Sequence, residues 1–136
     1  MISSTVGLKW KRQKMKNRIL VIDDDEDQRD LVRAVLEVEG YEVLEASGGY
    51  TALEMVRENI PDMAIVDIFM PDMDGLETIT QLRARTSDMK IIAMSGCGLF
   101  QHSDYLSHAK EFGANAGITK PFRIDDLVKL VKSQFS

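Results

Sequence analysis

The chain has 136 residues, of which 44% are hydrophobic and 29% are charged. This length suits one compact domain with a core of its own and is too short for two domains of ordinary size. A single cysteine excludes an internal disulfide framework and a zinc site built from cysteines, and it favours a reducing, cytoplasmic setting. The longest apolar runs have about five residues, far from the roughly 20 that a membrane helix needs, so no membrane insertion is expected.

Charge is distributed unevenly along the chain. Residues 1–17 contain five basic residues and no acidic residue. Residues 18–136 carry the other 12 basic residues and all 22 acidic residues, which gives them a formal net charge of −10. We therefore expect a flexible basic N-terminal extension over 1–17 and a folded domain over 18–136. Because this domain is acidic, direct binding to nucleic acid is not expected.

Short apolar runs and amphipathic segments alternate from residue 18 onward. A fully buried strand is predicted over Arg18–Asp23, because its four consecutive apolar residues show no polar alternation. An amphipathic helix is predicted over Asp27–Glu39, and Gly40 ends it. A second strand and a second helix are predicted over Tyr41–Ala46 and Gly48–Asn59.

The second half of the chain continues this alternation. Pro61 breaks the chain before a third strand over Asp62–Asp67, and the turn-forming sequence MPDMDG then leads into a third amphipathic helix. The remaining predicted elements are a strand, a helix, a strand and a helix, over Lys90–Ser95, Ser103–Phe112, Asn115–Lys120 and the segment from Ile124 to Phe135.

Five strands separated by five helices predict an α/β fold. Parallel neighbours need long connections, so the pattern favours a doubly wound parallel sheet with right-handed crossovers, arranged as a three-layer sandwich. In such sheets a ligand binds beyond the carboxyl ends of the strands, where the strand order reverses. The residues that end the predicted strands are therefore the candidates for a functional site.

Charged and hydroxyl side chains stand at these strand ends. They are Asp23 with Asp24, then Asp67, Ser95 and Lys120. Two carboxylates about 4 Å apart repel by roughly 4 kcal/mol at an effective dielectric constant near 20, so a cation must offset the repulsion or a carboxylate must take up a proton. Hard carboxylate oxygens suit Mg²⁺, and the ammonium of Lys120 suits a phosphoryl group. This chemistry predicts phosphoryl transfer.

Four segments, ILVIDDD, AIVDIFMPDMDG, IIAMSG and ITKPF, together resemble the receiver domain of two-component response regulators, over Arg18 to Ser136. The resemblance implies the flavodoxin-like fold of the chemotaxis regulators, with strand order 2-1-3-4-5. It also implies that Asp67 accepts a phosphoryl group from a histidine kinase or a histidine phosphotransfer protein in a phosphorelay. Such a protein is an acceptor that phosphorylates and dephosphorylates itself rather than a turnover enzyme.

The resemblance further implies a magnesium site. Asp24 and Asp67 are expected to bind Mg²⁺ directly, Asp23 to hold a coordinated water, and the backbone carbonyl of Phe69 to supply another oxygen. The acids after the first strand have a second use, capping the following helix and complementing its dipole, which we expect of Asp25 and Asp27 rather than of Asp24.

The same resemblance gives roles to the last two strand ends. The Ser95 hydroxyl is expected to turn toward the phosphoryl oxygens, and Lys120 to pair with them, with a cis peptide bond between Lys120 and Pro121. Their pull on neighbouring loops would bias a partner-binding surface formed by the fourth helix and the fifth strand. Gly117 stands where receivers usually carry an aromatic switch residue, so we expect switching through rearrangement of the loop around Ser95 or by another route.

Other functions stay open on the sequence. A magnesium-dependent phosphatase of the haloacid dehalogenase class needs a second aspartate two positions after the first, where Phe69 stands. A flavin binder needs amides and hydroxyls in the first loop, which is acidic here. A receiver that has lost phosphorylation and only docks a partner is disfavoured by the intact acids. The sequence leaves open whether the domain stands alone or belongs to a larger regulator or hybrid kinase, what its downstream partner is, and whether it forms a homodimer on activation.

Overall fold

A computed structural model describes residues 16–96 and 102–136 of the chain. Strands and helices alternate along it: β1 Arg18–Ile22, α2 Glu26–Val38, β2 Glu42–Ala46, α3 Gly49–Glu58, β3 Met63–Asp67, α4 Gly75–Arg85, β4 Lys90–Ser95, α5 His102–Phe112, β5 Ala116–Thr119 and α6 Ile124–Phe135. Every predicted element is present, and the predicted bounds lie within one residue of those observed.

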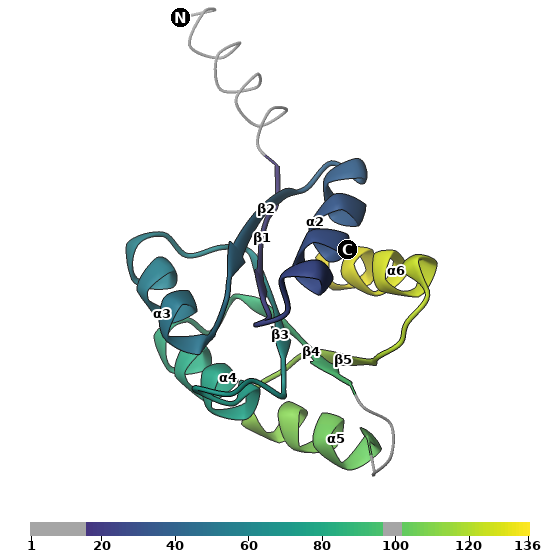
Figure 1. Cartoon of the computed structure of the whole chain (residues 1–136). Coiled ribbons are helices and arrows are strands. Elements are labelled where there is room, and N and C mark those ends of the chain that lie inside the picture. The colour runs from purple at the N-terminus through teal and green to yellow at the C-terminus, as the bar shows by residue number, and fades with distance from the viewer. Residues whose placement is uncertain (1–15, 97–101) are drawn as a thin grey trace, which may run out of the picture.

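The strands form one parallel sheet in the order β2-β1-β3-β4-β5. Helices α2 and α6 cover one face of this sheet, and α3, α4 and α5 cover the other (Figure 1). The predicted doubly wound, three-layer arrangement is confirmed. Because all five strands run the same way, their carboxyl ends meet at one edge.

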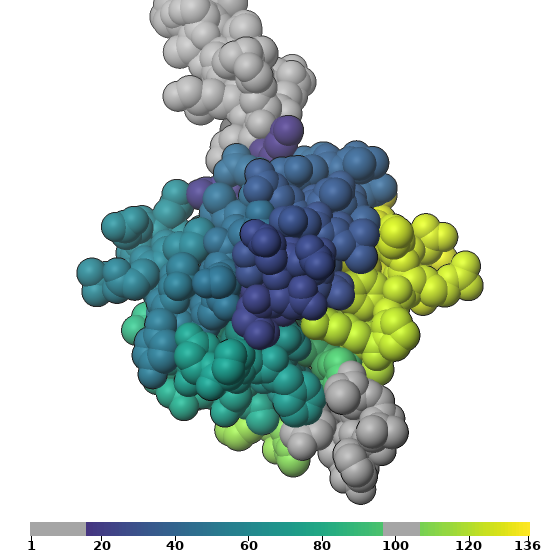
Figure 2. Space-filling model, viewed as in Figure 1, coloured from purple at the N-terminus to yellow at the C-terminus, as the bar shows by residue number. Residues whose placement is uncertain are grey.

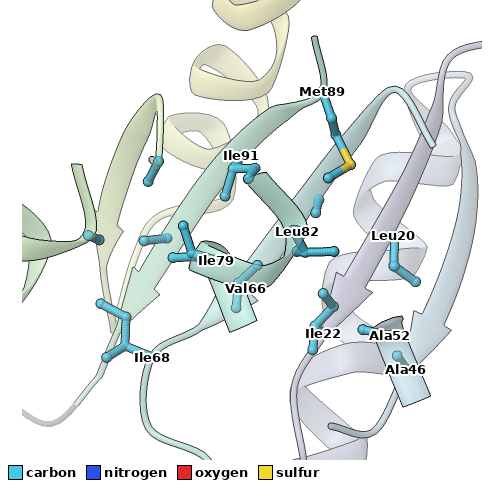
Figure 3. Packing of buried hydrophobic residues seen from close by; sticks show 14 of the residues in the cluster. Leu20, Ile22, Ala46, Ala52, Val66, Ile68, Ile79, Leu82, Met89 and Ile91 are labelled. Atoms are coloured by element: carbon cyan, nitrogen blue, oxygen red, sulfur yellow. The ribbon is translucent and has the colours of Figure 1, made fainter. Parts of the chain in front are cut away.

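Apolar side chains fill both layers between the sheet and the helices. In β1, Leu20 and Ile22 enter the core on the side of α3, α4 and α5. Ile19 and Val21 enter the core on the side of α2 and α6. Figure 3 shows the first of these layers, in which Ile79 of α4 lies among the strand residues. A strand covered on both faces needs an uninterrupted apolar run, since each fully buried leucine or isoleucine contributes about 1.5–3 kcal/mol.

Helices α2 and α6 lie side by side on one face, blue beside yellow in Figure 2. Val32 and Leu36 of α2 are fully buried there, as the helical spacing predicts. Leu31 of the same apolar stripe is instead 47% exposed. It lies about 100° around the helix from Val32, outside the narrow strip that contacts the sheet.

Two predicted features fall partly outside the described residues. The basic extension is described only at Lys16 and Asn17, and the loop after Ser95 only at Gly96. Within the part of the chain that the structure does describe, no helix combines the length and the apolar character needed to cross a bilayer.

Candidate functional site

The parallel register brings the predicted site residues to one edge of the sheet. The residues just before Asp23 and Asp67 are paired between β1 and β3, so these two aspartates stand next to each other. Ser95 ends the neighbouring strand β4, and Lys120 directly follows β5, which is paired with β4. The strand order therefore brings all four residues to the edge of the sheet around the carboxyl end of β3.

Three carboxylates form a cluster at this edge. Asp23, Asp24 and Asp67 each offer one oxygen, and these oxygens lie within 4.8 Å of one another. Asp23 and Asp67 are buried, whereas Asp24 is exposed. An oxygen-only donor set with one solvent-facing member fits a hard divalent cation that keeps some of its waters.

The acids after β1 have different local tasks. The Asp23 amide donates to the Ala46 carbonyl at 3.1 Å, which extends the pairing of β1 with β2. Asp25 is the N-cap of α2, and its carboxylate accepts hydrogen bonds from the amides of Asp27 and Gln28 at 3.0 and 3.3 Å. The helix-capping use expected of Asp25 is confirmed. The Asp25 carboxylate therefore caps the helix, whereas the Asp23 carboxylate belongs to the cluster.

Lys120 reaches into the carboxylate cluster from β5. Its Nζ lies 3.1 Å from Asp23 Oδ2 and 3.6 Å from Asp67 Oδ1. Its backbone amide donates to the Ser95 carbonyl at 2.8 Å, and the expected cis peptide bond to Pro121 is present. Gly96 leaves room for the lysine stem, since a Cβ at that position would lie 3.2 Å from Lys120 Cδ.

The environment of Asp67 opposes its negative charge. Burial raises the pKa of Asp67 from an ordinary 3.8 to about 7, and the charge of Asp23 adds to the rise. The ammonium of Lys120 lowers it, as does the Phe69 amide, which donates to Asp67 Oδ1 at 3.4 Å. Repulsion and burial therefore outweigh the single lysine, and a further cation at this edge would favour the carboxylate form.

Ser95 is completely buried at the end of β4. Among the described residues its Oγ has no hydrogen-bond partner. A buried hydroxyl without a partner costs about 1–3 kcal/mol. Because Ser95 stands between the strands that carry Asp67 and Lys120, its hydroxyl fits an added acceptor at this edge, such as a phosphoryl oxygen.

Two residues that shape the site were not singled out from the sequence. Gly75 donates its amide to the Ile68 carbonyl at 2.7 Å, and a Cβ there would collide with the Asp67 carbonyl oxygen and with Ile68 Cα. Only glycine allows the turn after β3 to return so close to Asp67. Arg29 of α2 donates through Nη1 to the Asp23 carbonyl at 2.7 Å. The turn sequence hints at the glycine, whereas no local pattern marks the arginine.

Comparison with known proteins agrees with this geometry. Residues 19–132 match the response regulator receiver domain family. Sporulation initiation phosphotransferase F of Bacillus subtilis (strain 168) is 33% identical over 118 residues, which cover 87% of this chain and 93% of that protein. Response regulator MprA of Mycobacterium sp. (strain KMS) is 34% identical over 122 residues, covering 88% of this chain. The chain spans only 50% of the length of that relative.

Solved structures resemble the chain over most of its length. The receiver domain of NtrX from Brucella abortus is 30% identical with a TM-score of 0.79, covering 85% of this chain and 95% of that one. Chemotaxis protein CheY4 of Vibrio cholerae is 26% identical with a TM-score of 0.80, covering 88% of this chain and 98% of that one. The sheet order, the acidic edge and the family match lead to one conclusion: the chain belongs to the receiver domains of two-component response regulators.

Proposed function

We propose that Asp67 is the residue on which this receiver domain accepts its phosphoryl group. Receiver domains are phosphoryl-accepting switches that interact with histidine kinases or phosphotransfer proteins. The proposal rests on one observation: Asp67 is a buried carboxylate at the strand end, with the Lys120 ammonium 3.6 Å away and two further carboxylates within 4.8 Å. Asp67 Oδ1 and Oδ2 are the only carboxylate oxygens supplied by β3 itself.

The acidic edge is the proposed Mg²⁺ site. Receiver domains bind Mg²⁺ at an acidic pocket, and the cluster of Asp23, Asp24 and Asp67 has the required oxygen donors. We assign Asp24 and Asp67 as direct ligands, Asp23 as the holder of a coordinated water, and the backbone carbonyl of Phe69 as a further ligand. When bound, Mg²⁺ supplies positive charge beside the oxygens of the group being transferred.

The side chains at the edge then have defined tasks in the transfer. An Asp67 carboxylate oxygen forms a bond to phosphorus while the bond from phosphorus to the imidazole nitrogen of the donor histidine breaks, and the electron pair leaves with that nitrogen. Lys120 neutralises charge on the phosphoryl oxygens, and the buried Ser95 hydroxyl donates a hydrogen bond to one of them. Positioning and electrostatics supply the catalysis, because phosphoryl transfer needs little covalent help from the protein.

We also propose that the switch moves the loop after Ser95. Gly117 lies in β5 without an aromatic side chain that could rotate. Ser95 and Lys120 are then the groups that would respond to the phosphoryl group. Ser95 leads into the loop before α5, and Lys120 leads into the loop before α6. Spectra recorded with and without beryllofluoride, a phosphoryl mimic, are expected to differ over residues 96–112. Unchanged resonances there would refute this route.

We propose that each protein molecule accepts one phosphoryl group on Asp67 and that the domain is not a phosphatase that hydrolyses many substrate molecules. Phe69, 44% exposed beside Asp67, occupies the position where a phosphatase of the haloacid dehalogenase class carries its second aspartate.

We place the domain at residues 18–136, since the family match covers 19–132 and α6 continues to Phe135. A cytoplasmic location, a histidine kinase or phosphotransfer protein as donor and a protein as downstream target belong to the same proposal.

Phosphorylation of the purified chain tests the assignment of Asp67. The wild-type protein, incubated with Mg²⁺ and either acetyl phosphate or a panel of histidine kinases, is expected to carry one phosphoryl group on the peptide that contains Asp67. Asp67→Asn is expected to remain unmodified. Asp88→Asn is the matched control, because Asp88 is exposed in the connection between α4 and β4. Equal labelling of Asp67→Asn and wild type would overturn the assignment, and release of many equivalents of phosphate would favour the phosphatase.

A further inference from the structure

We propose that Arg29 is a positioning residue. It fixes the peptide unit between Asp23 and Asp24 and thereby orients the Asp24 carboxylate relative to Asp23. The inference rests on the proposed Mg²⁺ site. Arg29 lies in the first turns of α2, where its amide donates to the carbonyl of the N-cap Asp25 at 3.0 Å. Its side chain extends back toward the end of β1, where it contacts the backbone carbonyl of Asp23.

The guanidinium of Arg29 links α2 to β2 and to the residue that follows β1. Its Nη1 donates to the Asp23 carbonyl oxygen at 2.7 Å, and its Nε donates to Glu45 Oε1 at 3.2 Å. The Arg29 side chain is only 13% exposed and that of Glu45 only 20% exposed. Water therefore competes weakly for these hydrogen bonds, and two bonds from one planar group hold the arginine in a single orientation.

The Asp23 carbonyl is the oxygen of the peptide unit that links Asp23 to Asp24. A hydrogen bond on this oxygen resists rotation of that peptide plane, and such a rotation would swing the Asp24 carboxylate relative to Asp23. The other groups of Asp23 are also held: its amide by Ala46, and its carboxylate by the Asp25 amide at 3.0 Å and by Lys120 at 3.1 Å. Arg29 supplies the contact that fixes the carbonyl.

Glu45 neutralises the charge of Arg29, so that the arginine does not act as a counterion for the acidic cluster. Hydrogen bonds from Arg33 and from Arg29 hold the pKa of Glu45 below its ordinary value, so Glu45 is ionised at neutral pH. The ion pair with Glu45 satisfies the arginine charge on the β2 side. Arg29 can then contact the backbone of Asp23 without serving as a counterion for the carboxylates that a divalent cation would bind.

Arg33 provides a matched control for Arg29. It lies one turn further along α2 and also contacts Glu45, with Nη1 2.7 Å from Oε2, but its other partner is Glu37 and not the strand end. Substitution of either arginine by glutamine removes one charge and one ion pair to Glu45. Only Arg29→Gln removes the hydrogen bond to the Asp23 carbonyl.

The test measures metal affinity and local backbone order in the full chain. Loss of a residue that orients metal ligands typically weakens metal binding by 10–100-fold. We expect Arg29→Gln to raise the Kd for Mg²⁺ at least about tenfold, read from amide shifts of residues 23–25. In metal-free protein, hydrogen exchange of the Asp24 and Asp25 amides is expected to speed up. Arg33→Gln is expected to leave both readouts within about twofold of wild type, and Arg29→Lys to restore part of the affinity.

The outcomes separate a positioning role of Arg29 from a purely stabilising one. Arg29→Gln with wild-type Mg²⁺ affinity and wild-type amide exchange would show that Arg29 only stabilises the fold. Equal losses in Arg29→Gln and Arg33→Gln would assign the effect to Glu45 and overturn the inference. If wild type itself bound no Mg²⁺, the proposed metal site would fail, while unchanged metal-free exchange in Arg29→Gln would still refute the positioning of the peptide.

Discussion

Asp67 is a carboxylic acid in a place that disfavours its charge. Burial and the adjacent Asp23 raise its pKa to about 7, and Lys120 offsets only part of this rise. Because the folded-state pKa lies above the ordinary value of 3.8, the folded protein binds this proton more tightly than the unfolded chain does. The metal-free fold therefore loses stability as pH rises from about 4 to about 7. A cation beside Asp67 would stabilise its charged form.

Replacing Asp67 by asparagine is expected to stabilise the metal-free protein. The substitution removes a buried charge while keeping the side-chain shape, so we expect the free energy of unfolding at pH 8 to rise by about 1–3 kcal/mol. At pH 4, where the aspartate is protonated, the gain should nearly vanish. Urea unfolding with a chelator at both pH values measures the difference, with Asp88→Asn as the control. A gain that is the same at both pH values would contradict the assigned origin.

Gly75 is expected to tolerate no side chain. A Cβ there would collide with backbone atoms of Asp67 and Ile68, which cannot move without displacing the strand end. We expect Gly75→Ala to lower the free energy of unfolding by about 1–3 kcal/mol. Gly96→Ala is the comparison, because among the described residues the three atoms nearest to a Cβ there belong to the flexible stem of Lys120, with Cδ at 3.2 Å. Equal stability losses in urea unfolding would show that the space at Gly75 is less restricted than the structure indicates.

At the scale of elements, Arg83 joins the last turn of α4 to two loops. Its guanidinium donates to the carbonyl of Met89 at 2.7 Å and to that of Gly113 at 2.8 Å. It also donates to the carbonyls of Thr86 and Ser87 and to the side chain of Asn115. The loop before β4 and the loop before β5 are thus held by one side chain. At the far ends of these strands, Ser95 closes β4 and Lys120 directly follows β5.

Removal of Arg83 is expected to destabilise the domain without touching the acidic edge. Hydrogen bonds to a charged group contribute about 1.5–3 kcal/mol each and are not additive, so we expect Arg83→Met to lose about 2–4 kcal/mol in urea unfolding. Arg83→Lys should recover little, because an ammonium lacks the planar set of donors. Arg85→Met is the control, since the hydrogen bonds of Arg85 to other described residues stay within α4, at Gln81. A loss equal to that of the control would contradict the bridging role.

At the scale of the whole molecule, the proposed Mg²⁺ site would couple metal binding to the stability of the fold. Binding of Mg²⁺ to the folded state alone stabilises it by about 2.7 kcal/mol at a concentration one hundred times Kd. We expect thermal unfolding to shift upward with added Mg²⁺ and the shift to disappear in Asp24→Asn. Asp25→Asn should keep it, because asparagine caps a helix as well as aspartate does. A shift that survives in Asp24→Asn would remove Asp24 from the ligand set.

The sequence by itself determined the order of elements, the parallel sheet and the edge where Asp23, Asp67, Ser95 and Lys120 meet. These features follow from local apolar patterns and from the rule that parallel strands end together. Only the tertiary structure decided that Lys120 lies closer to Asp23 than to Asp67, and that burial raises the pKa of Asp67. Only the tertiary structure also decided which arginine reaches the Asp23 carbonyl. Such contacts depend on the packing of segments far apart in the chain, and no pattern along one segment encodes them.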